Sequence, residues 1–286
     1  MTRLITGLGE IANDYDVLLC DVWGVIHNGR EAFPVACAAL SRWRRERGPV
    51  VLISNSPRPW RDVADQVEVL GVPREAWSSV VTSGDATRVL LAARAPGPAW
   101  RIGPQRDDPL YAGLGLRFAP LEEAAFIACT GPDDDENEAA EDYRQRLGRA
   151  AERGLEMVCA NPDKVVQRGE RLIICGGALA ALYEALGGQV RMAGKPWPAI
   201  YDLALASANG ELGRVANRRR VLAIGDGIAT DMIGANRQDL DGLFITGGIH
   251  GAEGLSPDGA LDPAAVEHLL GEQGARARFA MVGLAW

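Results

Sequence analysis

Histidine and cysteine are both scarce in this chain, and neither is clustered. The three histidines, at positions 27, 250 and 268, lie too far apart in the sequence to indicate a zinc site. The five cysteines include no Cys-x-x-Cys pair and mostly lie in apolar segments, which predicts reduced, buried thiols in a cytoplasmic protein. No apolar run has the length of a membrane span, and the first residues turn polar too soon for a signal peptide.

An excess of positive charge is also absent. The 38 acidic residues outnumber the 30 basic ones, and the formal net charge of −8 argues against nucleic acid or a membrane surface as a partner. Arginine clusters at 42–47 and 218–220 are interpreted as solvated surface. The 286 residues, 47% of them hydrophobic, are enough for one large or two modest globular domains.

Strand-like and helix-like segments alternate along the chain, which predicts an α/β fold with a parallel sheet. Strands are expected at 17–21, 50–54, 79–82, 100–103, 124–129, 156–160, 171–175, 220–225 and 242–246. Helices are expected at 33–47, 60–70, 85–93, 136–153, 178–186 and 198–208, and after residue 231. The pattern favours one sheet domain in two segments, 1–84 and 192–286, with a second α/β domain inserted at 85–191.

Four short motifs follow expected strands or precede expected helices, where an open α/β sheet binds its ligands. The first is Asp21, at the end of an apolar run, with a glycine three residues later where the backbone can turn sharply. Taken singly, each motif is also explained by a turn, a helix cap or a surface residue. The other three motifs are Ser54 with Asn55, Lys195 in a Gly-Lys-Pro run, and Asp226 with Asp231.

Together, the four motifs meet the chemical needs of phosphoryl transfer. A carboxylate such as Asp21 can attack phosphorus. Asp226 and Asp231 can hold or orient Mg²⁺, a hard cation that binds carboxylate and phosphate oxygens. The Ser54 hydroxyl, the adjacent backbone and Lys195 can neutralise charge on the transferring group. The sequence therefore predicts a Mg²⁺-dependent phosphatase.

In this order, the motifs resemble those of the haloacid-dehalogenase-like (HAD) hydrolases. The resemblance is closest to class IIA, the N-acetylglucosamine-operon phosphatase and p-nitrophenyl phosphatase type, and it covers nearly the whole chain. It implies a Rossmann-like parallel-sheet core with an inserted α/β cap domain that determines substrate specificity. The matching segments are Asp21-Val-Trp-Gly-Val, Ile53-Ser-Asn-Ser-Pro-Arg58, Asn161-Pro-Asp163, Gly194-Lys-Pro and Gly225-Asp-x4-Asp231.

The resemblance also implies roles for single residues. Asp21 would be the nucleophile that forms an aspartyl-phosphate, and it would also ligate Mg²⁺. Ser54 would bind the phosphoryl oxygens beside Asn55, and Lys195 would offset their negative charge. The other metal ligands would be the backbone carbonyl of Trp23 and the side chains of Asp226 and Asp231.

Trp23 stands where phosphatases of this family usually carry an aspartate that protonates the leaving oxygen. Indole has no titratable proton near neutral pH, and losing a general acid or base typically costs about 10²–10⁴-fold in rate. Two alternatives therefore stay open: a weakly active or non-catalytic HAD-like ligand-binding protein, and a dehalogenase-type hydrolase. His27 is a candidate substitute acid, although a loop histidine with no catalytic role is the simpler interpretation.

The inserted domain is expected to select the substrate, a sugar phosphate or similar small phosphorylated metabolite. Asn161 and Asp163 are its candidate substrate-binding residues, in a turn that follows an expected strand. The acidic run at 133–136 is interpreted as the solvated start of the helix expected from residue 136, because acids are favoured there. The resemblance leaves open a homodimer formed through the cap.

Overall fold

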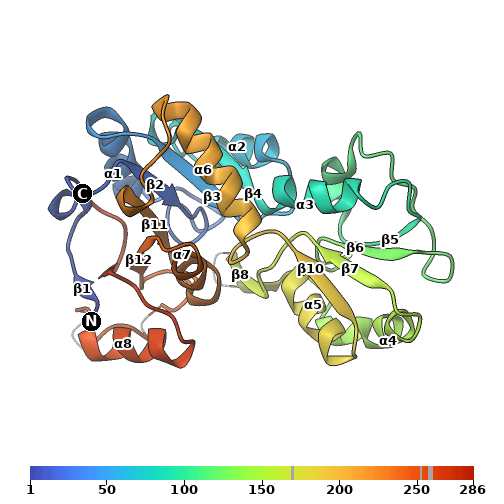
Figure 1. Cartoon of the computed structure of the whole chain (residues 1–286). Coiled ribbons are helices and arrows are strands. Elements are labelled where there is room, and N and C mark those ends of the chain that lie inside the picture. Colours follow the sequence, from blue (N-terminus) through green and yellow to red (C-terminus); the bar gives the residue numbers. More distant parts are fainter. Residues whose placement is uncertain (169–170, 252, 257–259) are drawn as a thin grey trace.

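The computed structural model describes residues 1–168, 171–251, 253–256 and 260–286. The chain forms two lobes, and each lobe is built around its own parallel sheet (Figure 1). The expected α/β class with a parallel-sheet core is confirmed. The larger sheet takes its strands from residues 3–82 and 221–281, and the smaller one from residues 99–192.

The larger sheet has seven strands in the order β1-β13-β12-β11-β2-β3-β4, and every neighbouring pair is parallel. Its central strands are buried along their whole length because helices cover both faces. The strands are β1 (Arg3–Leu4), β2 (Val17–Cys20), β3 (Val50–Ser54), β4 (Ser79–Thr82), β11 (Val221–Gly225), β12 (Asp241–Ile245) and β13 (Phe279–Met281).

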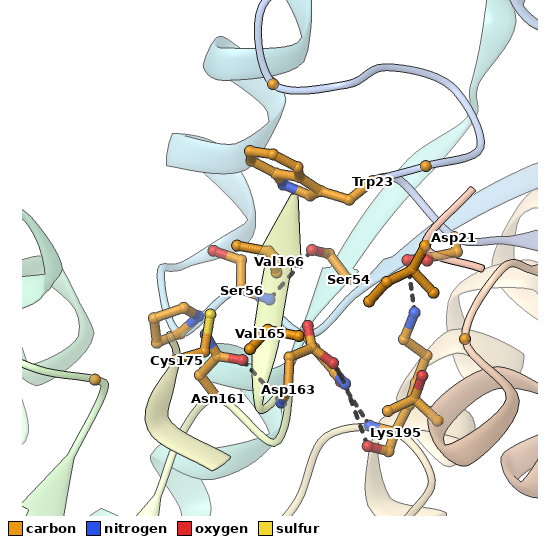
Figure 2. Close-up of a pocket in the computed structure, with 18 of the residues that line it drawn as sticks. Asp21, Trp23, Ser54, Ser56, Asn161, Asp163, Val165, Val166, Cys175 and Lys195 are labelled. Atoms are coloured by element: carbon orange, nitrogen blue, oxygen red, sulfur yellow. Dashed lines mark hydrogen bonds and ion pairs between the residues drawn. The ribbon is translucent and has the colours of Figure 1, made fainter. Parts of the chain in front are cut away.

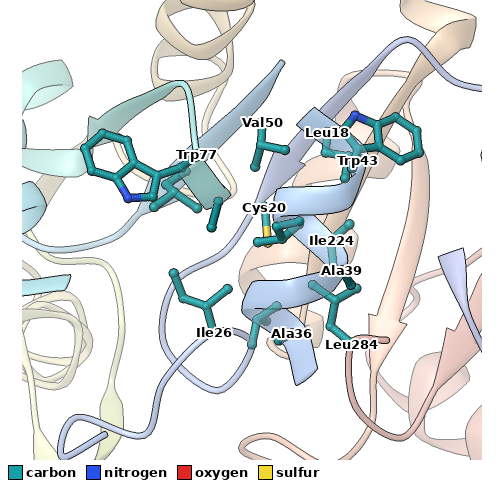
Figure 3. Close-up of a cluster of buried hydrophobic side chains, with 14 of the residues drawn as sticks. Leu18, Cys20, Ile26, Ala36, Ala39, Trp43, Val50, Trp77, Ile224 and Leu284 are labelled. Carbon is teal, nitrogen blue, oxygen red and sulfur yellow. The ribbon is translucent and has the colours of Figure 1, made fainter. Parts of the chain in front are cut away.

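Alternate residues of β2 enter two separate hydrophobic cores, one on each face of the sheet. Leu18 and Cys20 pack with Trp43 of α1 on one face (Figure 3), and Val17 and Leu19 pack under α6 on the other. Each fully buried apolar side chain of this size stabilises the fold by about 1.5–3 kcal/mol. The helices of this lobe are α1 (Pro34–Glu46), α2 (Trp60–Val69), α3 (Ser83–Ala92), α6 (Pro198–Leu212), α7 (Ile233–Arg237) and α8 (Pro263–Glu272).

The smaller lobe has a four-stranded parallel sheet in the order β10-β7-β6-β5. Tyr143 and Tyr183 are fully buried in the core that this sheet shares with its two helices. A separate antiparallel hairpin pairs β8 (Val165–Arg168) with β9 (Arg171–Ile174). The other elements are β5 (Ala99–Ile102), β6 (Phe126–Cys129), β7 (Glu156–Cys159), β10 (Gln189–Met192), α4 (Arg144–Glu152) and α5 (Gly176–Ala185).

Short helical turns link several of these elements. Among the described residues, five are 3₁₀ segments, and the one that follows β11 is a single π-helical turn. The segments are Leu8–Glu10, Arg74–Ala76, Gln105–Tyr111, Ala140–Tyr143, Arg218–Arg220 and, as the π-helical turn, Ile228–Met232.

The helix expected from residue 136 is wrong in its start, because α4 begins at Arg144. Asp134 accepts hydrogen bonds from the Glu136 N–H and the Asn137 amide, and Glu138 accepts from the Asp134 N–H. Such local side-chain bonds compete with helical ones. The strand expected at 171–175 is present as β9, but it belongs to the hairpin rather than to a parallel sheet.

Several helices and strands of the structure were not expected from the sequence, namely β1, β8, β10, α8 and β13. The predicted domain limits of 1–84, 85–191 and 192–286 stay a prediction. The first limit falls inside α3, which contacts α6 of the larger lobe and β7 of the smaller one.

Candidate active site

A cavity of about 570 Å³ is lined by residues of both lobes. The nine residues that the sequence suggests as catalytic, substrate-binding or metal-binding groups all line it, although they come from segments far apart in the chain. Figure 2 labels Asp21, Trp23, Ser54, Asn161, Asp163 and Lys195 among them. Parallel strands of one sheet end at the same edge, which is how their loops converge. The nine residues are Asp21, Trp23, Ser54, Asn55, Asn161, Asp163, Lys195, Asp226 and Asp231.

Asp21, Lys195 and Asp231 form a buried ion-paired cluster at this edge. Asp21 directly follows β2, and Asp231 lies in the π-helical turn after β11. The Lys195 ammonium donates hydrogen bonds to Asp21 Oδ1 at 2.6 Å and to Asp231 Oδ1 at 2.8 Å. Burial alone would lower the pKa of Lys195, but the nearby carboxylates outweigh it and hold that pKa well above its ordinary value. Lys195 is therefore a fixed positive charge between two carboxylates.

Asp226 joins Asp21 and Asp231 in a group of three carboxylates, and one oxygen of each lies within 4.8 Å of the others. Burial, followed by the charges of Asp21 and Asp231, raises the pKa of Asp226 well above its ordinary value. Burial and then Asp21 raise the pKa of Asp231 to about 6. Crowded carboxylate oxygens of this kind fit a hard divalent cation such as Mg²⁺, whose charge offsets their repulsion.

Two glycines leave the space that the Asp226 carboxylate occupies. A Cβ atom at Gly24 would lie 1.9 Å from Asp226 Oδ2, and one at Gly248 would lie 2.0 Å from the same oxygen. Gly24 also has a φ of +74°, a conformation that costs other residues energy. The Ile249 N–H donates to Asp226 Oδ2 at 2.7 Å. The backbone around Asp226 is therefore shaped to hold this carboxylate in one place.

Ser54 and Asn55 connect the end of β3 to the ion-paired cluster. The Ser54 hydroxyl oxygen accepts a hydrogen bond from the Ser56 N–H at 3.2 Å, which fixes the side chain at the cavity wall. Asn55 Oδ1 accepts from the Lys195 N–H at 2.8 Å, and Asn55 Nδ2 donates to Asp163 Oδ1 at 2.8 Å. Asn55 thus bridges the lysine of the larger lobe and an acid of the smaller lobe.

Asp163 and Asn161 come from the loop after β7 and enter the cavity from the smaller lobe. The Asp163 N–H donates to Asn161 Oδ1 at 3.1 Å, so the expected Asx turn is present. Burial raises the pKa of Asp163, while Lys195 and the Asn55 hydrogen bond oppose that rise. The segment from Asn161 to Asp163 therefore forms a turn and also lines the cavity, so a turn does not exclude a contact with the substrate.

The Trp23 side chain lines the cavity beside Asp21 and is fixed by its neighbours. Its ring lies against Gly29, where a Cβ atom would be 2.3 Å from Trp23 Cη2. It also meets the ring of His27 edge-on, with centroids 4.9 Å apart and planes at 73°. These contacts hold an aromatic ring in the position where the resemblance leads one to expect an acid. The role of the Trp23 carbonyl stays a prediction.

His27 is poorly placed to act as the substitute acid. It is buried, and it is not among the described residues that line the cavity. Its Nδ1 accepts a hydrogen bond from the Gly29 N–H at 3.0 Å, and burial lowers its pKa to about 4. Neutral His27 instead packs against the Trp23 ring, and its interpretation as a loop histidine with no catalytic role stays a prediction.

The acidic run at 133–136 does not begin a helix, which corrects the interpretation made from the sequence. Asp133 accepts from the Gly103 N–H at 2.9 Å, joining the loops after β6 and β5. Asp135 lines the cavity and pairs with Arg106 of the smaller lobe at 2.5 Å. The helical interpretation considered only interactions within the run, whereas Asp133 and Asp135 bind the loop that follows β5.

Several other residues that line the cavity were not expected from the sequence. Arg58 belongs to a matching motif, but the resemblance implies no role for it. On the larger lobe, Asn28, Gln66, Gly248 and Ile249 also line the cavity. On the smaller lobe, the strand-end rule applied to the second sheet would have found the residues in the loops after β5 and β6. The unexpected cavity residues of the smaller lobe include Arg106, Asp107, Thr130, Asp135, Val165, Val166, Ile174 and Cys175.

Family models match two parts of the chain. Residues 18–117 match the haloacid dehalogenase-like hydrolase model, and residues 192–272 match the HAD-hydrolase-like model. Among curated proteins, D-glycerol 3-phosphate phosphatase of Mycobacterium tuberculosis is 30% identical over 251 residues, covering 85% of this chain and 66% of that protein. The 5'-nucleotidase YutF of Bacillus subtilis is 24% identical and covers 85% of this chain and 92% of that protein.

Solved structures of haloacid-dehalogenase-like hydrolases and phosphatases are also similar to this chain. A hydrolase of the haloacid dehalogenase-like family from Brucella suis has a TM-score of 0.89 and 43% identity, covering 99% of this chain and 100% of that one. The glycerol phosphate phosphatase of Mycobacterium tuberculosis in complex with magnesium has a TM-score of 0.61 and 28% identity, covering 84% and 70%. Within the described residues, no helix has both the length and the hydropathy to cross a bilayer.

Proposed function

The chain belongs to the haloacid-dehalogenase-like hydrolases, and from this premise we propose that it is a Mg²⁺-dependent phosphatase of small phosphomonoesters. The observation that carries the proposal is the cluster of three carboxylates and one lysine beside Ser54 in a single cavity. The phosphatase names of its relatives, and the magnesium in a related structure, support it.

Asp21 is the proposed nucleophile. Burial raises the pKa of its carboxyl, and Lys195 opposes that rise by its charge and its hydrogen bond. The ionised form, which attack on phosphorus requires, is thus stabilised by the lysine. One Asp21 oxygen forms a bond to phosphorus while the bond from phosphorus to the leaving oxygen breaks. Water then attacks the aspartyl-phosphate, releases phosphate and restores Asp21.

Ser54 and Lys195 are the proposed ligands of the phosphoryl oxygens, and both are already fixed by hydrogen bonds before a substrate arrives. Asp21, Asp226, Asp231 and the Trp23 carbonyl are the proposed metal ligands. The bound cation supplies charge neutralisation for the phosphoryl group. Asn161 and Asp163 are the proposed contacts from the inserted domain.

Trp23 limits the proposed reaction, because it cannot give a proton to the leaving oxygen. Substrates with good leaving groups, such as aryl phosphates, need this proton least. The same side chain favours a second candidate function, a weakly active or non-catalytic protein that binds a phosphorylated ligand. A dehalogenase-type reaction is less well supported, because three clustered carboxylates suit a cation, which attack on carbon does not need.

Phosphate release from p-nitrophenyl phosphate, with Mg²⁺ and with EDTA, tests the proposal. We expect Mg²⁺-dependent release that Asp21→Asn abolishes and that Asp65→Asn, on the exposed face of α2, leaves unchanged. Tight binding of a phosphate-mimicking fluoride complex without any release would favour the ligand-binding protein. Release that survives Asp21→Asn would refute the assigned nucleophile.

The natural substrate is proposed to be a sugar phosphate or similar metabolite. A cytoplasmic location is proposed from the unpaired cysteines, and a homodimer through the smaller lobe is proposed from the family resemblance. Size-exclusion chromatography with light scattering tests the dimer directly.

A further inference from the structure

Arg58 occupies a rigid loop that begins at the proposed phosphate-binding residue Ser54. Two consecutive turns coil the loop: the Ser56 N–H donates to Ser54 Oγ at 3.2 Å, and the Arg58 N–H donates to Ser56 Oγ at 3.3 Å. Prolines flank Arg58 on both sides and restrict the backbone. The loop also packs on Gly84, where a Cβ atom would lie 2.8 Å from the Arg58 carbonyl oxygen. The backbone of Arg58 is therefore held in place.

The guanidinium of Arg58 is a partly buried cation without a charged partner. It lines the cavity, and its side-chain hydrogen bond goes to the neutral amide of Gln66 on α2. Among the described residues, no ion pair includes Arg58. Burial lowers the pKa of Arg58, although the charges of Asp107 and Asp62 oppose this, and the group stays protonated.

Arg106, an arginine that also lines the cavity, differs from Arg58 in having a charged partner. It comes from the smaller lobe and pairs with Asp135 at 2.5 Å. Most of the donor capacity of Arg58 is thus unused, whereas Arg106 is engaged by a carboxylate. An arginine with free donors at a cavity wall is suited to a planar or tetrahedral anion, which it can bind through two parallel hydrogen bonds.

We propose that Arg58 binds a second anionic group of the substrate, a carboxylate or a phosphate on its leaving-group side. This assignment rests on the proposed function and names the substrate class: a small phosphomonoester with a second negative charge. Arg58 lies four positions after Ser54, which is at most about 14 Å of extended backbone, and the two turns shorten this span. Both residues line the same cavity, so one small substrate can contact both.

A competing account is that Arg58 links the two lobes through Asp107. Asp107 is buried in the smaller lobe and its charge acts on Arg58, but the two form no ion pair. A lobe contact would affect every ligand equally. A substrate contact would affect only ligands with a second anion, and this difference is the basis of the test.

The test compares three non-hydrolysable probes by titration calorimetry in Mg²⁺: phenylphosphonate, 4-carboxyphenylphosphonate and 1,4-benzenediphosphonate. The variants are Arg58→Gln, Arg58→Lys and, as a matched control, Arg61→Gln, which removes an exposed arginine three residues further on. We expect at least one second-anion probe to bind the wild-type protein about tenfold to hundredfold more tightly than phenylphosphonate. Arg58→Gln should abolish that preference, Arg58→Lys should keep part of it, and Arg61→Gln should keep all of it.

The probe that binds more tightly than phenylphosphonate shows whether the second anion is a carboxylate or a phosphate. The proposal is overturned if the wild-type protein has no preference, or if Arg58→Gln weakens all three probes equally. Because binding is read without turnover, its result is separate from that of p-nitrophenyl phosphate hydrolysis. An Arg58-dependent preference without hydrolysis would refute the phosphatase and leave this anion site standing. Hydrolysis of p-nitrophenyl phosphate without any preference for the second-anion probes would refute the Arg58 anion site and leave the proposed phosphatase standing.

Discussion

Replacing Asp226 by asparagine should make the metal-free protein more stable while removing its response to Mg²⁺. Oxygens of Asp226, Asp21 and Asp231 lie within 4.8 Å of one another. At an effective dielectric constant of about 20, two unit charges at that separation repel by about 3.5 kcal/mol. Lys195 and partial protonation offset part of this repulsion. We therefore expect a net gain of about 1–3 kcal/mol in the free energy of unfolding at pH 7.

The gain in the free energy of unfolding from Asp226→Asn should increase with pH. The pKa of Asp226 is raised in the folded protein, mainly by burial, so the folded state holds its proton more tightly than the unfolded state. That contribution to stability is present at low pH and is lost as the pH rises towards the folded pKa. The advantage of Asp226→Asn over the wild-type protein should consequently be larger at pH 7 than at pH 5.

Urea denaturation at both pH values, in EDTA and in Mg²⁺, measures these effects. Mg²⁺ at one hundred times its dissociation constant should stabilise the wild-type protein by about 2.7 kcal/mol, and it should stabilise Asp226→Asn far less. Asp65→Asn, outside the cavity, should behave like the wild-type protein. The reasoning is refuted if Asp226→Asn is the less stable protein in EDTA at pH 7, or if Mg²⁺ stabilises both equally.

Three further predictions concern the groups around the carboxylates. Trp23→Asp should raise kcat/KM, which reports phosphoryl transfer to Asp21, for alkyl phosphates relative to p-nitrophenyl phosphate by about 10²-fold or more, since it supplies the absent acid; an unchanged ratio of the two kcat/KM values would argue against a proton-transfer role at this position. Gly24→Ala should weaken Mg²⁺ binding at least tenfold in calorimetry, because its Cβ atom would displace the Asp226 carboxylate. Equal affinity would contradict the claim that Gly24 leaves the space in which this carboxylate is held. Asn55→Ala should raise KM more than it lowers kcat, because it frees Asp163 from Lys195; a fall in kcat alone would place Asn55 in the chemical step instead.

The placement of the site could be predicted because it depends on the ends of strands. Asp21, Ser54 and Asp226 each end or follow a buried parallel strand, and one sheet edge brings them together. Lys195 could be predicted only through its motif. It precedes α6 rather than following a strand of the larger sheet, so its two ion pairs depend on the packing of the whole lobe.

Other features of the site could not be read from one sequence. The space for the Asp226 carboxylate is left by Gly24 and Gly248, which lie more than two hundred residues apart in the chain. No pattern in the neighbouring sequence indicates that these two glycines lie together. Pairing of Arg106 with Asp135 joins two loops in the same way, and together with the local hydrogen bonds of the Asp134 and Glu138 side chains it holds the acidic run outside a helix. Local patterns identified the strand ends, whereas contacts between distant loops required the structure.

Rapid mixing of the protein with p-nitrophenyl phosphate shows whether Asp21 takes up the phosphoryl group. Because Trp23 cannot activate water, hydrolysis of the aspartyl-phosphate should be slow and the intermediate should accumulate. We expect a burst of nitrophenolate close to one equivalent per chain, and a phosphoryl group on the peptide that contains Asp21 after acid quenching and mass spectrometry. Mg²⁺-dependent turnover with no burst and no phosphoryl group on that peptide would contradict this role of Asp21.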